Sequence, residues 1–147
     1  MTPHKRRPEP GLTLIEVLVA MLVMSAGLMG TLALRLASLK ANVNGHARAG
    51  AAVHASEAFD RLRANPVRAM AGRYNLAIDA AAPADANDIV SQDLRQWRSA
   101  LAGTLADGIG SLQVSATGLA TVEIRWTERD STLGRGRAMR FSFVTQL

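Results

Sequence analysis

A long apolar run near the start of the chain constrains the fold more than any other feature of the sequence. Residues 12–34 contain Glu16 as their only charged side chain, and residues 17–34 contain none. At about 1.5 Å per residue, a helix over this run spans about 34 Å, which is close to the thickness of a bilayer's hydrocarbon core. The run is therefore long enough to cross a membrane.

The remaining composition limits the chemistry that is available. The chain has 147 residues, about one domain, and no cysteine, so disulfides, zinc–thiolate sites and cysteine nucleophiles are excluded. The sequence contains no HExxH, P-loop, GxSxG or dinucleotide-binding fingerprint. His46 and His54 are two helical turns apart and cannot share a metal ion, so both are expected to be solvated. We therefore expect no enzyme, no cofactor and no catalytic or metal-binding residue.

Two simple interpretations of the apolar run leave observations unexplained. A cleaved secretory signal has a shorter apolar region and a small-residue cleavage site, whereas this run is too long and no Ala-x-Ala follows it directly. A plain membrane anchor explains the length but not Glu16. An ionisable group in a lipid-facing helix costs several kcal/mol unless it reaches the interface or finds a partner, so a partner for this carboxylate must be sought.

Residues 11–17, Gly-Leu-Thr-Leu-Ile-Glu-Val, resemble the cleavage and methylation motif of type IV prepilins and pseudopilins. In that family prepilin peptidase removes a basic leader after the glycine and methylates the new amino terminus. The resemblance implies cleavage between Gly11 and Leu12 and N-methylation of Leu12, which departs from the phenylalanine most members carry. It also implies that Glu16 is the subunit-pairing carboxylate, which meets the terminal amine of a neighbouring subunit.

A helical period continues beyond the apolar run and predicts one helix from about Leu12 to Ala64, ending ahead of Pro66. Its apolar stripe consists of Leu36, Leu39, Val43, Ala47, Ala51, Ala55, Phe59 and Leu62. The predicted domains are a leader peptide at 1–11, a transmembrane or filament-core helix at 12–34, its amphipathic continuation at 35–65 and a periplasmic globular region at 66–147.

The carboxy-terminal region predicts a loop, a short helix and three strands. Residues 66–88 indicate a loop with at most short turns, and a helix capped by Asp88 follows, with Trp97 in the core and Gly108 and Gly110 at its end. Alternating apolar residues then predict strands at 112–117, 120–126 and 139–143, with Gly118 between the first two. The predicted fold class is α+β and pilin-like: a long N-terminal helix, half transmembrane, packed on a small antiparallel β-sheet.

Segments across the chain resemble the PilV-type, or type IV pilus modification, minor pilins: 60–66, 72–75, 93–98, 122–126 and 143–145. The resemblance implies a low-abundance pilin that acts in pilus assembly, with downstream roles in twitching motility, adhesion or DNA uptake. The implied partners are the inner membrane, prepilin peptidase, other minor and major pilins, and the pilus assembly platform. The basic leader would stay cytoplasmic and the carboxy-terminal domain periplasmic under the positive-inside rule, with later incorporation into the pilus.

Other functions remain open at this point. A type II secretion minor pseudopilin shares the same amino terminus. An anchored DNA-binding domain is suggested by the net charge of +5 and by an arginine cluster around Trp126 and Phe141, namely Arg125, Arg129, Arg135, Arg137 and Arg140. Without the leader, 14 basic and 11 acidic side chains leave a charge of only +3, and Glu123, Glu128 and Asp130 lie among the arginines. This pattern favours a solvated sheet rim over DNA contact.

Overall fold

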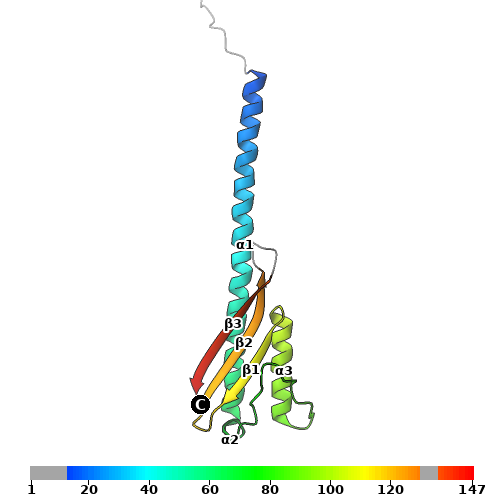
Figure 1. Ribbon diagram of the computed structural model, residues 1–147, viewed down its shortest axis with the longest axis vertical. Coiled ribbons are helices and arrows are strands. Elements are labelled where there is room, and N and C mark those ends of the chain that lie inside the picture. Colours follow the sequence, from blue (N-terminus) through cyan, green and yellow to red (C-terminus); the bar gives the residue numbers. More distant parts are fainter. Residues whose placement is uncertain (1–12, 130–135) are drawn as a thin grey trace, which may run out of the picture. The chain divides into compact units, whose positions relative to one another are not determined.

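A computed structural model describes residues 13–129 and 136–147 of the chain (Figure 1). The elements in chain order are α1 (Leu14–Ala64), α2 (Pro66–Met70), α3 (Ile89–Thr104), β1 (Ile109–Val114), β2 (Leu119–Arg129) and β3 (Gly136–Gln146). The chain divides into two compact units, Met1–Leu39 and Lys40–Leu147, here called the amino-terminal and carboxy-terminal units, and α1 contributes residues to both. A long helix followed by a small antiparallel sheet confirms the predicted α+β, pilin-like fold.

In the amino-terminal unit, α1 is an exposed apolar helix. It begins where the main-chain oxygen of Thr13 accepts hydrogen bonds from the amides of Glu16 and Val17, at 3.0 and 3.3 Å. The large apolar side chains of this unit are between 40% exposed, at Val17, and 79% exposed, at Leu14. An 18-residue window of α1 has a mean hydropathy of 2.2, and none of it is buried within the described chain. By length and composition this helix can cross a membrane.

In the carboxy-terminal unit, α1 gains a buried face. The residues on it are Ala51, His54, Ala55, Ala58, Phe59 and Leu62. The predicted stripe is therefore right from Ala51 onward, but Leu36, Leu39 and Val43 are about 60% exposed, at 59%, 61% and 62%. Periodicity identifies an apolar stripe, and it carries no information on how far along the helix another element covers that stripe.

A short helix follows α1 where a loop with at most short turns was predicted. The first helix ends at Ala64, as expected from Pro66, because the residue before a proline disfavours the helical conformation. Pro66 then begins α2, where its missing amide hydrogen costs no helical hydrogen bond. Ala69, which is fully buried, anchors this turn to the core. Proline thus separates two helices here instead of opening a loop.

The third helix starts as predicted and ends earlier. The carboxylate of Asp88 accepts the amide hydrogen of Ser91 at 3.2 Å, which confirms it as the N-cap. The helix ends at Thr104 because Leu105 is already extended. Gly110 lies inside β1 instead of ending the helix, and a Cβ added to it would approach Cη2 of Trp97 to 2.5 Å. The glycine is therefore used for close packing of a strand on the helix.

The sheet has the order β1-β2-β3 with antiparallel pairing throughout. In its centre Val122 pairs with Leu112 on one side and with Phe143 on the other. Gly118 adopts a left-handed φ of 82° in the turn between β1 and β2, which confirms the turn predicted there. The second and third strands extend beyond their predicted apolar centres, whereas the first strand begins and ends three residues earlier than its predicted range of 112–117.

One hydrophobic cluster of the described residues joins α1, α3 and the inner face of the sheet, and Figure 1 shows these elements gathered in the carboxy-terminal unit. Trp97 is 1% exposed, which confirms its predicted place in the core. Its Nε1 donates a hydrogen bond to the main-chain oxygen of His54 at 2.9 Å and so ties α3 to α1. Trp126 and Phe141 pack edge to face at 5.0 Å across β2 and β3.

Candidate processing and assembly segment

The predicted site residues lie at the start of the chain, on both sides of the first described residue. Gly11 and Leu12, the predicted cleavage and methylation positions, lie outside the described residues. Glu16 lies in the first turn of α1, with an exposed side chain. A carboxylate in a first helical turn interacts favourably with the unpaired amides there and with the positive end of the helix dipole.

Glu16 is the only charged side chain among the described residues 13–34. The ion pairs formed within residues 13–129 and 136–147 do not include it. Its neighbours along the helix are apolar, with Leu14 and Ile15 at 79% and 70% exposure. A carboxylate at the end of an exposed apolar helix is available to a cation that another molecule brings to it. Such a pair would gain strength as the surrounding medium becomes less polar.

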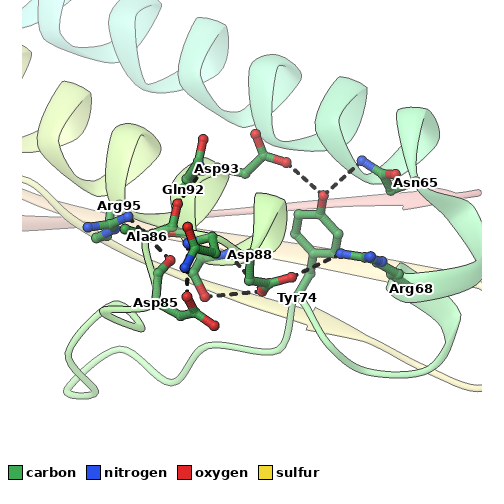
Figure 2. Close-up of polar contacts among 11 residues, drawn as sticks. Asn65, Arg68, Tyr74, Asp85, Ala86, Asp88, Gln92, Asp93 and Arg95 are labelled. Atoms are coloured by element: carbon green, nitrogen blue, oxygen red, sulfur yellow. Dashed lines mark hydrogen bonds and ion pairs between the residues drawn. The ribbon is translucent and has the colours of Figure 1, made fainter.

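The carboxy-terminal unit places most of its polar side chains in hydrogen-bonded networks. Figure 2 shows the network around Tyr74, whose hydroxyl donates to Asp93 at 2.7 Å and accepts from Nδ2 of Asn65 at 3.2 Å. Tyr74 is 1% exposed. Burial and then the hydrogen bond to Asp93 raise the pKa of Tyr74 to about 12. The phenol therefore stays protonated and serves as a fixed link between α3 and the segment after α2.

A second link in the same view holds α2 to the start of α3. Nη1 of Arg68 lies 2.9 Å from Oδ1 of Asp88, while Oδ2 of Asp88 caps α3 through Ser91 (Figure 2). Partial burial raises the pKa of Asp88, but the hydrogen bonds from Ser91 and the charge of Arg68 outweigh it, so the pKa lies below its ordinary value. This carboxylate has a structural role.

A bidentate ion pair links α1 to the end of β2. Nε and Nη2 of Arg48 each donate to one carboxylate oxygen of Glu128, both at 3.0 Å. The Glu128 side chain is 5% exposed, whereas that of Arg48 is 50% exposed. The hydrogen bonds from Arg48 hold the pKa of Glu128 below its ordinary value. Two parallel hydrogen bonds fix the geometry more strictly than a single ion pair would.

The arginine cluster predicted as a possible DNA contact is partly committed to one carboxylate. Arg125 and Arg140 lie directly opposite each other on β2 and β3, and both contact Glu123, at 2.6 and 2.8 Å. Burial raises the pKa of Glu123, but the two guanidinium groups outweigh it and lower the pKa below its ordinary value. Arg135 and the side chain of Arg129 lie outside the described part of the structure. Two arginines of the cluster therefore share a single carboxylate, which reduces the positive charge of this surface and leaves it positive.

The histidines differ from the prediction that both are solvated. His46 is exposed, but His54 is 8% exposed, and its Nδ1 lies 3.0 Å from Oε2 of Glu57. The prediction for His54 was wrong because the histidine lies on the helical face that Trp97 covers, next to the buried residue Ala55. Within the described residues, no group of three or more His, Asp or Glu side chains could hold a metal ion.

Sequence reasoning missed the polar links within the carboxy-terminal unit. Arg48 and Glu128 are 80 residues apart, and Tyr74 and Asp93 are 19 apart in segments predicted as a loop and a helix face. Arg98 likewise donates to the carbonyl oxygens of Ala77, Ile78 and Ala80 and so fixes that loop. No local spacing predicts such pairs. A surplus of long cationic side chains facing a loop rich in carbonyls was the available hint.

The comparison with protein families supports the motif at the start of the chain. The family description Prokaryotic N-terminal methylation motif matches residues 6–32, a segment that includes Gly11, Leu12 and Glu16. No curated protein and no solved structure matches the chain. The pilin-motif family is structural, and its motif implies processing by prepilin peptidase. The chain thus carries a type IV prepilin-like methylation motif at the start of a long apolar helix.

Proposed function

We propose that this chain is a PilV-type minor pilin, a structural subunit that acts in the biogenesis of a type IV pilus. The observation that carries the proposal is the methylation motif at residues 6–32, which runs into a membrane-length helix with no buried residue in its apolar window. Residues 1–11 are the leader, 12–34 the membrane anchor that becomes filament core, 35–65 its amphipathic continuation and 66–147 the periplasmic region. The resemblance of residues 60–66 and 72–75 to PilV-type pilins supports the finer assignment.

Processing follows from the chemistry of the leader. Lys5, Arg6 and Arg7 keep the amino terminus cytoplasmic, so the bond between Gly11 and Leu12 lies at the cytoplasmic face of the inner membrane. Glycine has no Cβ and lets an extended backbone approach a protease groove closely. Prepilin peptidase cleaves there and methylates the new amine of Leu12.

Assembly follows from the two charges that processing leaves at the end of the helix. The amine of Leu12 and the carboxylate of Glu16 would each be penalised alone in an apolar helix bundle. An amine from one subunit beside Glu16 of its neighbour removes both penalties, and the attraction grows in a low dielectric. Because apolar side chains slide past each other with little preference, this pair fixes the axial register of neighbouring helices.

The first test is the intact mass of the membrane-extracted protein from cells with and without prepilin peptidase. We expect peptidase-dependent loss of residues 1–11 and the addition of one methyl group. A Gly11→Val variant should keep the leader in both strains. Glu16→Gln, the matched control, should be cleaved normally and fail to enter sheared filaments. An unprocessed wild-type chain in both strains contradicts the proposal and leaves an anchored domain.

A type II secretion minor pseudopilin is the second candidate. Major pilins typically carry a proline in the apolar half of the helix, and residues 12–34 of this chain contain none, which favours a minor pilin or a pseudopilin equally. The two machines are distinguished by extraction from the membrane. Loss of the pilus assembly platform should keep a type IV minor pilin in the membrane fraction, whereas loss of the secretion platform should have this effect on a pseudopilin.

A further inference from the structure

The two edges of the sheet are treated differently by the chain. The outer edge of β1 is covered, because Leu76 and Leu112 exchange main-chain hydrogen bonds of 2.8 and 3.0 Å. The amide of Val114, on the same edge, donates to Oδ1 of Asn75 at 2.7 Å. At the opposite edge β3, Gly136–Gln146, has β2 as its only strand partner within the described residues. One edge is closed by the chain itself and the other is open.

The main-chain groups on the open edge can be identified from the register. The amide of Leu147 donates to the carbonyl of Gly118, and Thr145 pairs with Ala120, so odd-numbered residues of β3 direct their main-chain groups toward β2. The intervening residues Arg140, Ser142 and Val144 direct theirs away from the sheet. Within the described residues these amides have no main-chain hydrogen-bond partner. An exposed row of this kind is a template for another strand.

The charged side chains of β3 itself are both positive. The sequence of β3, GRAMRFSFVTQ, contains Arg137 and Arg140 and no acidic residue. Arg63 of α1, whose Nη1 lies 3.4 Å from Oδ1 of Asp60, reaches the same strand with Nη2 at 3.2 Å from Oγ1 of Thr145. The neighbouring carboxylate of Glu123 is already shared by Arg125 and Arg140. A partner strand therefore meets main-chain donors that have no main-chain partner within the described residues, and beside them lie the exposed guanidinium groups of Arg63, Arg137 and Arg140.

We propose that the open edge of β3 binds an extended, acidic segment of a partner protein, which adds to the sheet as a fourth strand. Main-chain hydrogen bonds at Arg140, Ser142 and Val144 supply the pairing, and carboxylates of the partner meet the arginines. A second copy of β3 fits less well, because it contains no carboxylate that could meet the arginines. The proposal does not depend on the pilin assignment, since it concerns only the carboxy-terminal unit.

The test uses the full chain in detergent micelles and short fluorescent peptides in which valine alternates with glutamate or with lysine. We expect the glutamate peptide to bind and the lysine peptide to bind at least about tenfold more weakly. Ser142→Pro removes one outward amide without touching the ladder to β2, and it should weaken binding by about tenfold. Ser142→Ala keeps the amide and is the matched control. Arg140→Gln should weaken binding of the glutamate peptide and leave binding of the lysine peptide unchanged.

Amide hydrogen exchange on the wild-type protein gives a second measurement that needs no variant. Binding of the glutamate peptide should slow exchange at Arg140, Ser142 and Val144 and leave Phe141 and Phe143 unchanged. Equal binding of both peptides, or an unchanged exchange pattern, overturns the proposal. So does binding of single-stranded DNA that Arg140→Gln abolishes and Ser142→Pro leaves intact, because that result assigns the surface to charge alone.

Discussion

The same helix serves two environments, and comparing its parts shows what each requires of the sequence. In the amino-terminal unit α1 is apolar on every side, and its large side chains are exposed in the described chain. In the carboxy-terminal unit it is largely apolar on one face, and this face buries three alanines, Phe59, Leu62 and His54. Within residues 13–129 and 136–147 nothing buries the apolar window of the first part, whereas α3 and the sheet cover one face of the second part. Helical propensity alone does not distinguish the two parts of α1 from each other.

The difference teaches where stability and assembly are encoded. The carboxy-terminal unit holds its elements together with buried side chains and with specific polar pairs such as Arg48–Glu128 and Tyr74–Asp93. The α1 residues of the amino-terminal unit carry two charges, Glu16 near the start and Arg35 near the end, and the surface between them is apolar. Substitutions in the carboxy-terminal unit should therefore affect folding. Substitutions in the amino-terminal unit should affect membrane or subunit association.

The largest effect is expected from Trp97→Ala, which removes the centre of the core and the hydrogen bond to the main chain of His54. We expect a loss of about 3–5 kcal/mol in the free energy of unfolding of the carboxy-terminal unit. Chemical denaturation of the detergent-solubilised chain, followed by near-ultraviolet circular dichroism, measures it. Val53→Ala, at a side chain that is 57% exposed, should change stability by less than about 0.5 kcal/mol. Loss of membrane association in Trp97→Ala would break the separation.

The converse change is Leu22→Arg, at a side chain that is 71% exposed in the amino-terminal unit. A charged group near the middle of a membrane helix raises the free energy of insertion by about 2.5–3.5 kcal/mol. Membrane fractionation should show a larger soluble fraction, while the denaturation midpoint of the carboxy-terminal unit stays unchanged. Leu22→Phe is the control and should fractionate as the wild type does. A shifted midpoint in Leu22→Arg would contradict the division into two units.

Glycines test the comparison at a finer scale. Gly110→Ala places a methyl group 2.5 Å from Cη2 of Trp97 and 2.8 Å from Cδ1 of Leu101, so we expect overpacking to cost about 1–3 kcal/mol. Gly27→Ala, in the amino-terminal unit, meets nothing within 4 Å and should leave the midpoint unchanged. Thermal unfolding of both variants provides the comparison. Equal melting temperatures for Gly110→Ala and the wild type would show that the strand can shift to accept the methyl group.

These glycines also show how far sequence reasoning could reach. Period-two and helical patterns located every strand and the two longer helices, because local alternation is written into neighbouring residues. Gly110 was assigned to a helix end because a glycine after an apolar period is typical of a helix terminus, and only the tertiary contact with Trp97 explains it otherwise. A helix end and a close contact between a strand and a helix both favour glycine, so the sequence alone does not tell them apart.

The candidate site could be predicted from the sequence where it consists of consecutive residues. The methylation motif lies in consecutive residues, and so its recognition needed no fold. His54 and the pair Arg48–Glu128 depend on which elements cover α1, and the helical period does not contain that information. The open edge of β3 depends in turn on Leu76 covering the other edge. Features formed by two segments that are distant in the sequence could therefore be identified only in the structure.

The smallest effect is expected from the pH dependence of the carboxy-terminal unit. Because Arg48 holds the pKa of Glu128 below its ordinary value, the unfolded state takes up the proton first as the pH falls. The stabilisation is complete above the unfolded pKa of about 4.3 and is lost as the pH falls through the lower, folded pKa. Arg48→Gln should therefore flatten the fall in stability below about pH 5, measured as denaturation midpoints across acid pH.

The control for this measurement lies about two turns earlier on the same helix. Lys40→Gln removes the same charge from the same helix without touching Glu128, so it should keep the wild-type slope. Glu123 and Asp88 also have lowered pKa values and account for the slope that remains in Arg48→Gln. If Lys40→Gln flattens the curve as much as Arg48→Gln does, the acid sensitivity reflects net charge, and the specific pairing that distinguishes the carboxy-terminal unit does not contribute to it.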